Sequence, residues 1–81
     1  MARIIDFELN NIIGGNVKRL RIEKKMSQKE LSNRLETYAI YVCRGSISRL
    51  ESRERTVTDF ELKALSEILG VSIYDLFERD K

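Results

Sequence analysis

Several polar side chains gather in one short stretch of the chain, where they could bind a ligand by hydrogen bonding. The segment Arg44–Glu51 opens with arginine, glycine and serine and continues with Ser48 and Arg49. The planar guanidinium of arginine matches phosphate oxygens, carboxylates and the O6 and N7 atoms of guanine. A serine hydroxyl can donate or accept at similar groups. The side chains of this stretch are therefore suited to recognising a ligand by hydrogen bonds.

The amino-acid inventory argues against most catalytic and metal-binding functions. The chain has 81 residues, no histidine and one cysteine, and it lacks a glycine-rich phosphate loop. A lone cysteine cannot form an internal disulfide, and a zinc site would lack ligands. The most common general base is also missing. We therefore expect no enzyme, no metal and no cofactor.

The length and the apolar pattern indicate one soluble domain. A chain of 81 residues builds a single small core. Its longest apolar run is too short to cross a membrane. Asp6 and Glu8 stand where a signal peptide would need apolar residues. We therefore expect a cytoplasmic protein.

The charges are unevenly distributed although their sum is only +2. Basic residues dominate from Lys18 to Glu30 and from Arg44 to Arg55, whereas acidic residues dominate from Asp59 onward. This arrangement indicates that a polyanion docks on one side. Charged helix faces are common in soluble proteins, so the pattern alone does not decide the ligand.

The elements that must position these side chains are helices. Apolar residues at spacings of three and four predict a first helix over about residues 12–25, with Asn10 or Asn11 as its N-cap. The apolar residues of Met1–Leu9 lack helical spacing, and they suit either a strand-like arm or an extra turn. Ser27 and Glu30 form a capping box that starts a second helix.

A third helix is predicted from Arg44 to about Arg53. A capping box of Thr58 and Glu61 starts a fourth helix, which Gly70 ends, and Ser72 with Asp75 opens a short fifth one. The positions predicted to be buried in the second and third helices are Leu31, Leu35, Tyr38, Ile47 and Leu50. Those assigned to the core or to a subunit contact in the last two helices are Leu62, Leu65, Leu69, Ile73 and Phe77. Short connections between five helices predict an all-α domain over residues 12–78, with an arm or extra turn at 1–11 and a tail at 79–81.

Four sequence pieces, in order, resemble the helix-turn-helix domain of the Cro/C1-type (XRE) repressor family. They are Asn16–Arg21, Ser27–Leu31, Ser46–Glu51 and Leu69–Phe77. The resemblance implies a compact five-helix, lambda-repressor-like fold whose second and third helices form the helix-turn-helix. It also implies a sequence-specific DNA-binding transcriptional regulator, expected to be a repressor that binds a pseudo-palindromic operator as a homodimer.

The resemblance further implies a role for individual residues. The helix that enters the major groove should read base edges with its first two turns, that is, with Arg44, Gly45, Ser46, Ser48 and Arg49. The residues expected to contact DNA phosphates are Ser27, Gln28, Lys29, Arg19, Arg53, Arg55 and Thr56. Arg21 and Glu51 should form a partly buried ion pair that fixes the reading helix.

The sequence departs from the family pattern between the two helices of the motif. The stretch Glu36–Val42 is longer than usual and contains no glycine. We expect the helix before it to continue for a turn, with Ile40 or Val42 packed into the core. In the alternative, a tyrosine hydroxyl of this stretch, at Tyr38 or Tyr41, contacts the DNA backbone.

Two further positions allow more than one interpretation. Cys43 stands at an N-cap where the family prefers serine or threonine, and we interpret it as a tolerated replacement, with redox sensing as the alternative. Gly45 either permits close approach to DNA or is simply tolerated. The subunit contact could involve the last helix (Ile73, Tyr74 and Phe77) or the N-terminal arm (Ile4, Ile5 and Phe7). A different function for the same fold is a protein-interaction module, such as an antitoxin or a regulatory subunit.

Overall fold

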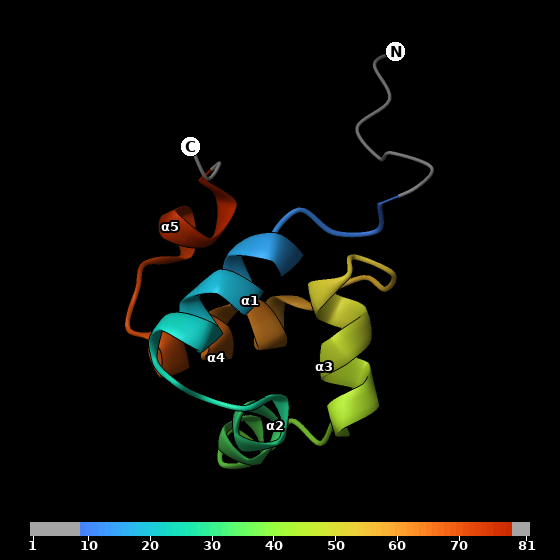
Figure 1. Cartoon of the computed structure of the whole chain (residues 1–81), viewed down its shortest axis with the longest axis vertical. Coiled ribbons are helices and arrows are strands. Elements are labelled where there is room, and N and C mark those ends of the chain that lie inside the picture. Colours follow the sequence, from blue (N-terminus) through green and yellow to red (C-terminus); the bar gives the residue numbers. More distant parts are fainter. Residues whose placement is uncertain (1–8, 79–81) are drawn as a thin grey trace.

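The computed structural model describes residues 9–78, and this part of the chain contains helices and no strand. In chain order the helices are α1 (Gly14–Glu23), α2 (Gln28–Glu36), α3 (Arg44–Glu51), α4 (Asp59–Leu69) and α5 (Ile73–Phe77) (Figure 1). The expected all-α, five-helix architecture is thereby confirmed. The apolar arm residues Ile4, Ile5 and Phe7 and the tail 79–81 lie outside the described residues.

Three helices begin at the capping boxes that the sequence predicts. The Ser27 hydroxyl accepts from the Glu30 backbone N–H at 3.0 Å, and the Glu30 carboxylate accepts from the Ser27 N–H at 2.9 Å. The same reciprocal arrangement starts α4 and α5. Each box satisfies two backbone donors that a helix start would otherwise leave unpaired. Gly70 ends α4 with a φ of 71°, a left-handed conformation that glycine adopts without strain.

The bounds of α1 and α3 differ from the prediction. Helix α1 begins at Gly14 and ends at Glu23, although the apolar pattern suggested residues 12–25. Asn11 acts as a cap from two positions before the N-cap residue, because its Oδ1 accepts from the Gly14 N–H at 2.8 Å. Positive φ angles at Lys25 (57°) and Arg53 (65°) stop α1 and α3, since an α-helix requires negative φ.

The stretch between α2 and α3 corrects another expectation. Helix α2 ends at Glu36 and does not continue for a further turn, because Ala39 adopts a φ of 62°. Ile40 and Val42 do pack against the core as expected. Tyr38 was predicted to be buried, but it is 42 % exposed. Partial desolvation and a bond to the Glu67 carboxylate of α4 raise the pKa of the Tyr38 hydroxyl.

One apolar core joins all five helices. Helices α2 and α3 contact each other, α1 and α4 pack against this pair, and α5 closes the core against α1 and α4. The buried apolar residues are Ile13, Val17, Leu20, Met26, Leu31, Leu35, Ile47, Leu50, Ala64, Leu65, Leu69 and Leu76. Leu62 is partly buried, while Ile73 and Phe77 are each 42 % exposed, so Leu76 is the residue that anchors α5. No described helix is long and apolar enough to cross a membrane.

Candidate nucleic-acid interface

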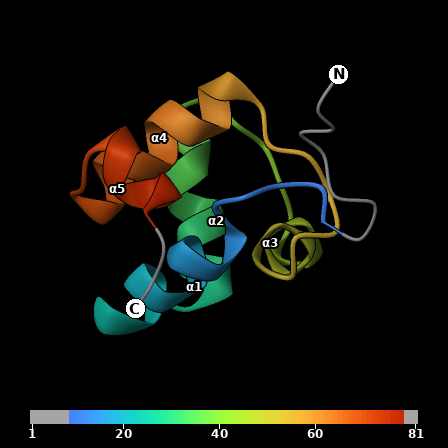
Figure 2. The ribbon, with the colours of Figure 1, turned by 90° about the horizontal axis from the view of Figure 1, so that it is seen from above.

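Helix α3 has one buried face and one polar, exposed face. Ile47, Leu50 and Glu51 point into the protein. The polar residues left exposed along the helix are Arg44, Gly45, Ser48 and Arg49, and Ser46 is half-buried. Figures 1 and 2 place α3 at one side of the molecule, away from α5. The residues predicted to read bases therefore lie on or beside an outward-facing helix surface.

A groove separates one side of α2 from the start of α3. Lys29 and Arg44 line the same groove, which has a volume of about 370 Å³. Tyr41 and Cys43 also line this groove, so the long connection between the helices contributes to its wall. Tyr41 is 75 % exposed. The structure thus brings a predicted phosphate-binding residue and a predicted base-reading residue onto one surface.

An ion pair fixes the last residue of α3 to α1. Arg21 Nε donates to Glu51 Oε2 at 2.6 Å and Arg21 Nη2 donates to Glu51 Oε1 at 3.1 Å. Both residues are buried, at 8 % and 7 % exposure. The third guanidinium nitrogen, Nη1, donates to the Met26 carbonyl at 2.7 Å. This two-point geometry fixes the end of α3 against α1.

Gln28, predicted to bind phosphate, is connected to the same ion pair. Its side-chain Nε2 donates to Glu51 Oε1 at 3.1 Å. The amide nitrogen of glutamine carries two hydrogens, so it has a second donor in addition to the one aimed at Glu51. Glu51 therefore orients the Gln28 amide at the start of α2, where the backbone N–H groups of the helix also favour an anion.

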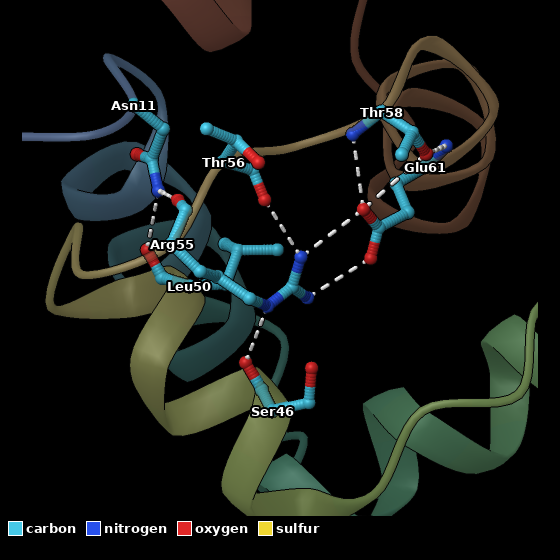
Figure 3. A network of polar contacts seen from close by, with 7 residues as sticks. All are labelled: Asn11, Ser46, Leu50, Arg55, Thr56, Thr58 and Glu61. Carbon is cyan, nitrogen blue, oxygen red and sulfur yellow. Dashed lines mark hydrogen bonds and ion pairs between the residues drawn. The ribbon is translucent and has the colours of Figure 1, made fainter.

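Arg55, which lies in the loop after α3, forms several hydrogen bonds within the protein. It was assigned to the phosphate-binding set, but its Nη1 and Nη2 donate to the two Glu61 carboxylate oxygens at 3.1 and 2.9 Å. Its Nε donates to the Ser46 carbonyl at 3.0 Å, and Nη1 also bonds the Thr56 carbonyl (Figure 3). The Arg55 side chain is 20 % exposed. All three guanidinium nitrogens of Arg55 thus donate within the protein, an arrangement that favours a structural role over the predicted phosphate contact.

Sequence reasoning missed the partner of Arg55. Glu61 was recognised as a capping residue of α4, and its carboxylate does accept from the Thr58 N–H at 3.0 Å. Burial raises the pKa of Glu61, but the bonds from Arg55 and Thr58 outweigh this effect and leave the pKa below its ordinary value. In the sequence, Glu61 follows Arg55 by six positions. A loop can bring two such residues into contact, but this spacing does not require it.

Asn11 also does more than cap α1. Its Nδ2 donates to the Leu50 carbonyl of α3 at 3.0 Å and to the Arg55 carbonyl at 2.8 Å (Figure 3). One side chain therefore joins the start of α1, the end of α3 and the loop that follows α3. A buried or half-buried side-chain amide satisfied at both ends rigidifies such a junction.

Arg53, also predicted to contact phosphate, lies beside the junction of α1 with the end of α3. It packs over the first turn of α1, where a Cβ at Gly15 would come within 2.7 Å of Arg53 Nη2. A Cβ at Gly14 would come within 2.3 Å of the Leu50 carbonyl oxygen, so glycine is required there. These two glycines allow α1 to approach the end of α3.

The last three residues predicted to contact phosphate do not form one cluster. Ser27 and Thr56 are exposed. Arg19 donates to Glu23 Oε2 at 3.1 Å and to the side-chain Oδ1 of Asn16 at 3.4 Å, on the side of α1 where Asn16 contacts the end of α5. The structure therefore does not bring Arg19 to the groove between α2 and α3.

Cys43 is exposed at the N-cap of α3 and makes no capping hydrogen bond with its side chain. The backbone N–H of Ser46 lowers the pKa of the thiol, and the Gly45 N–H and the Arg49 charge act in the same direction against partial desolvation. The helix start thus favours a thiolate at the edge of the candidate interface. Among the described residues, no cluster of acidic and cysteine side chains could hold a metal ion.

A comparison with protein families agrees with this geometry. The model of the helix-turn-helix family matches residues 17–76, a range that runs from the first half of α1 into α5 and includes α2 and α3 completely. No curated protein and no solved structure matches the chain. The match covers well over half of the sequence, and the helices follow one another in the order that the resemblance implied. The chain therefore belongs to the Cro/C1-type (XRE) helix-turn-helix family of DNA-binding regulators.

Proposed function

We propose that the protein is a transcriptional repressor that binds a pseudo-palindromic operator as a homodimer. Helix α3 of each copy enters the major groove, and its first two turns read base edges. The observation that carries the proposal is the exposed polar face of α3, opposite a buried face fixed by Arg21 and Glu51. A rigid helix with arginines on its outer face suits direct readout of DNA.

Arg44 and Arg49 are the principal base readers in this proposal. Each guanidinium can donate two hydrogen bonds to guanine, a contact that contributes about 1–3 kcal/mol of discrimination. Ser46 and Ser48 have shorter reach and contact bases or phosphates close to the helix axis. At Gly45 a Cβ would meet only ordinary contacts, with Arg49 Nη1 at 3.6 Å and Cys43 Sγ at 3.7 Å. The fold does not require glycine there, and we propose that its absent side chain lets DNA approach the helix.

The phosphate contacts come from both sides of α3. Ser27, Gln28 and Lys29 supply donors and charge at the start of α2, where the helix dipole also attracts an anion. Arg53 and Thr56, in the loop that follows α3, contact the DNA phosphates on the other side of α3. These contacts set the register of α3 on the duplex without reading sequence.

A dimer supplies the affinity that one small module lacks. The chain has a net charge of only +2, so one copy neutralises few phosphates. Two copies related by two-fold symmetry place their reading helices about 34–36 Å apart, one turn of DNA. Helix α5 lies on the side of the molecule away from α3 and exposes Ile73, Tyr74 and Phe77 (Figure 2). We propose α5 as the subunit contact, since it leaves α3 free for DNA.

In this proposal the protein represses by occupying promoter DNA, which needs only the helix-turn-helix domain that the family match covers. The test is selection of binding sites from a pool of random duplexes at about physiological salt. The proposal predicts enrichment of an inverted repeat whose half-sites are about 10 bp apart. Binding that depends on salt but enriches no sequence would contradict it.

A protein-interaction module is the second candidate function. The observation in its favour is a mostly apolar groove of about 490 Å³, lined by residues 9–13, the start of α4 and Phe77. Such a groove could hold a side chain of another protein. Co-purification of a second chain in a fixed ratio, together with no sequence enrichment from the DNA pool, would favour this function over the first.

A further inference from the structure

Two arginines hold α3 from opposite ends. Arg21 of α1 bonds the carboxylate of Glu51, the last residue of the helix. Arg55, in the loop that follows α3, reaches back and donates from Nε to the carbonyl of Ser46 in the first turns at 3.0 Å. A short helix held only at its end can tilt, whereas one held at both ends keeps a fixed direction.

The second arginine is itself fixed by α4. Glu61 accepts from Arg55 Nη1 and Nη2 at 3.1 and 2.9 Å, and its Oε1 also accepts from the Thr58 backbone at 3.0 Å (Figure 3). The Arg55 and Glu61 side chains are 20 % and 6 % exposed, so water screens the pair weakly. The chain of contacts runs from the first turns of α3 through Arg55 and Glu61 to the first turn of α4.

We propose that Arg55 and Glu61 are positioning residues for DNA recognition. They fix the first turns of α3, and through them the direction of Arg44 and Ser46, toward the base edges. This inference rests on the function proposed above. Base-reading hydrogen bonds tolerate displacements of only about 0.5 Å, so a tilt of α3 costs specificity before it costs phosphate contacts.

The inference differs from a phosphate-binding role for Arg55 in a measurable way. If Arg55 contacted phosphate, Glu61 would compete with DNA for it, and removal of the Glu61 charge would strengthen binding to every sequence. If Arg55 positions α3, the same removal weakens binding to the selected site and leaves binding to random DNA nearly unchanged.

The most informative variant is Glu61→Gln. Glutamine also serves as the third residue of a capping box, so the bond to the Thr58 N–H survives while the charge on Arg55's partner is lost. The matched control is Glu67→Gln on the same helix, which removes an equal charge from the exposed pair with Lys63. Arg55→Met removes the donors and keeps the apolar stem of the side chain.

The experiment measures the ratio of affinities for the selected operator and a random duplex over a series of salt concentrations. We expect Glu61→Gln and Arg55→Met each to lower this ratio about tenfold, the loss of affinity expected when one base contact is displaced. The double variant should lower it no further than Arg55→Met. The salt dependence should match that of the Glu67→Gln control.

Three results of these binding measurements would overturn the inference. One is a ratio unchanged in Glu61→Gln, and another is stronger binding of that variant to both duplexes. The last is a salt slope for Arg55→Met smaller by about one than that of the wild type, the sign of a lost phosphate contact.

A measurement without DNA separates this inference from the proposed function. Amide hydrogen exchange over Arg44–Glu51 should be faster in Glu61→Gln than in Glu67→Gln, because α3 loses its second anchor. Equal exchange in the two variants overturns the positioning role whatever the DNA data show. If the wild type prefers no sequence, the proposed function fails, and the exchange data alone then decide whether Arg55 and Glu61 hold α3.

Discussion

Arg21 Nε lies 2.6 Å from Glu51 Oε2, and this contact joins α1 to the last residue of α3. The pair is almost completely buried, with side chains 10 % and 3 % exposed. Glu51 accepts from Gln28 as well, so one carboxylate organises residues from α1, α2 and α3. The start of α2 and the face of α3 are therefore held in one fixed arrangement.

Removing one member of this pair should destabilise the fold strongly. Arg21→Met leaves the Glu51 carboxylate buried without its cation, and breaking a buried pair in this way typically costs about 3–5 kcal/mol. Urea unfolding of the purified variant measures the loss. The double variant Arg21→Met/Glu51→Leu should recover part of it, because no uncompensated charge stays buried. A single variant within about 0.5 kcal/mol of wild type, as for an ordinary surface substitution, would contradict this account.

The free energy of unfolding should fall in acid partly through Glu61. Burial raises the pKa of Glu61, but the bonds from Arg55 and Thr58 lower it by a larger amount. The pKa of Glu61 is therefore lower in the folded protein than in the unfolded chain. Such a group stabilises the fold above the ordinary glutamate pKa, about 4.3, and this contribution is lost as the pH falls through the folded-state value. Stability measured between neutral pH and about pH 3 should decline more steeply for wild type than for Glu61→Gln. Parallel curves would show that Glu61 does not contribute.

Cys43 offers a test of where DNA lies. The thiol is exposed at the start of α3, and the backbone N–H of Ser46 lowers its pKa, so a maleimide should modify it readily. Bound operator should protect the thiol, and prior modification should abolish operator binding, because the added group occupies the groove. Cys43→Ser is the control: serine caps a helix better, and we expect about 0.5–1 kcal/mol of added stability with operator binding retained. Equal modification rates with and without operator would place DNA elsewhere.

The phosphate-binding residues should behave differently from the base readers. Gln28→Ala and Arg53→Ala should each weaken binding to operator and random duplexes by a similar factor. For Arg53→Ala the slope of log affinity against log salt should also fall by about one, because one ionic contact is lost. Titrations at several salt concentrations measure both quantities. A selective loss of operator binding in either variant would contradict the assignment to phosphate.

Local signals in the sequence predicted much of the fold. The capping boxes at Ser27, Thr58 and Ser72 and the glycine at 70 are determined by neighbouring residues, and the structure confirms them. The ends of α1, α2 and α3 were harder to predict, because Lys25, Ala39 and Arg53 adopt positive φ without being glycine. Such conformations are imposed by the surrounding structure and leave no signature in residue type.

In the candidate site, too, some contacts were predicted and others depend on the surrounding structure. The pairing of Arg21 with Glu51 was expected from the family resemblance and is present in the structure. The bonds of Arg55 to Glu61 were not predicted, because the sequence does not distinguish a cationic loop residue that faces solvent from one that faces a carboxylate of the next helix. Its pairing with Glu61 depends on the path of the 52–58 loop, which the sequence pattern does not define. Tyr38 was predicted to be buried on helical spacing, but α2 ends before reaching it.

The most direct test of the central claim is to repeat the duplex selection with Arg44→Ala. If the first turn of α3 reads bases, the variant should still enrich an inverted repeat, but with base preference lost at one symmetric position in each half-site. The affinity for the original operator should fall by about 1–3 kcal/mol while the salt dependence changes little. An enriched motif identical to that of the wild type would show that α3 does not read DNA through Arg44, and the account of this interface would be wrong.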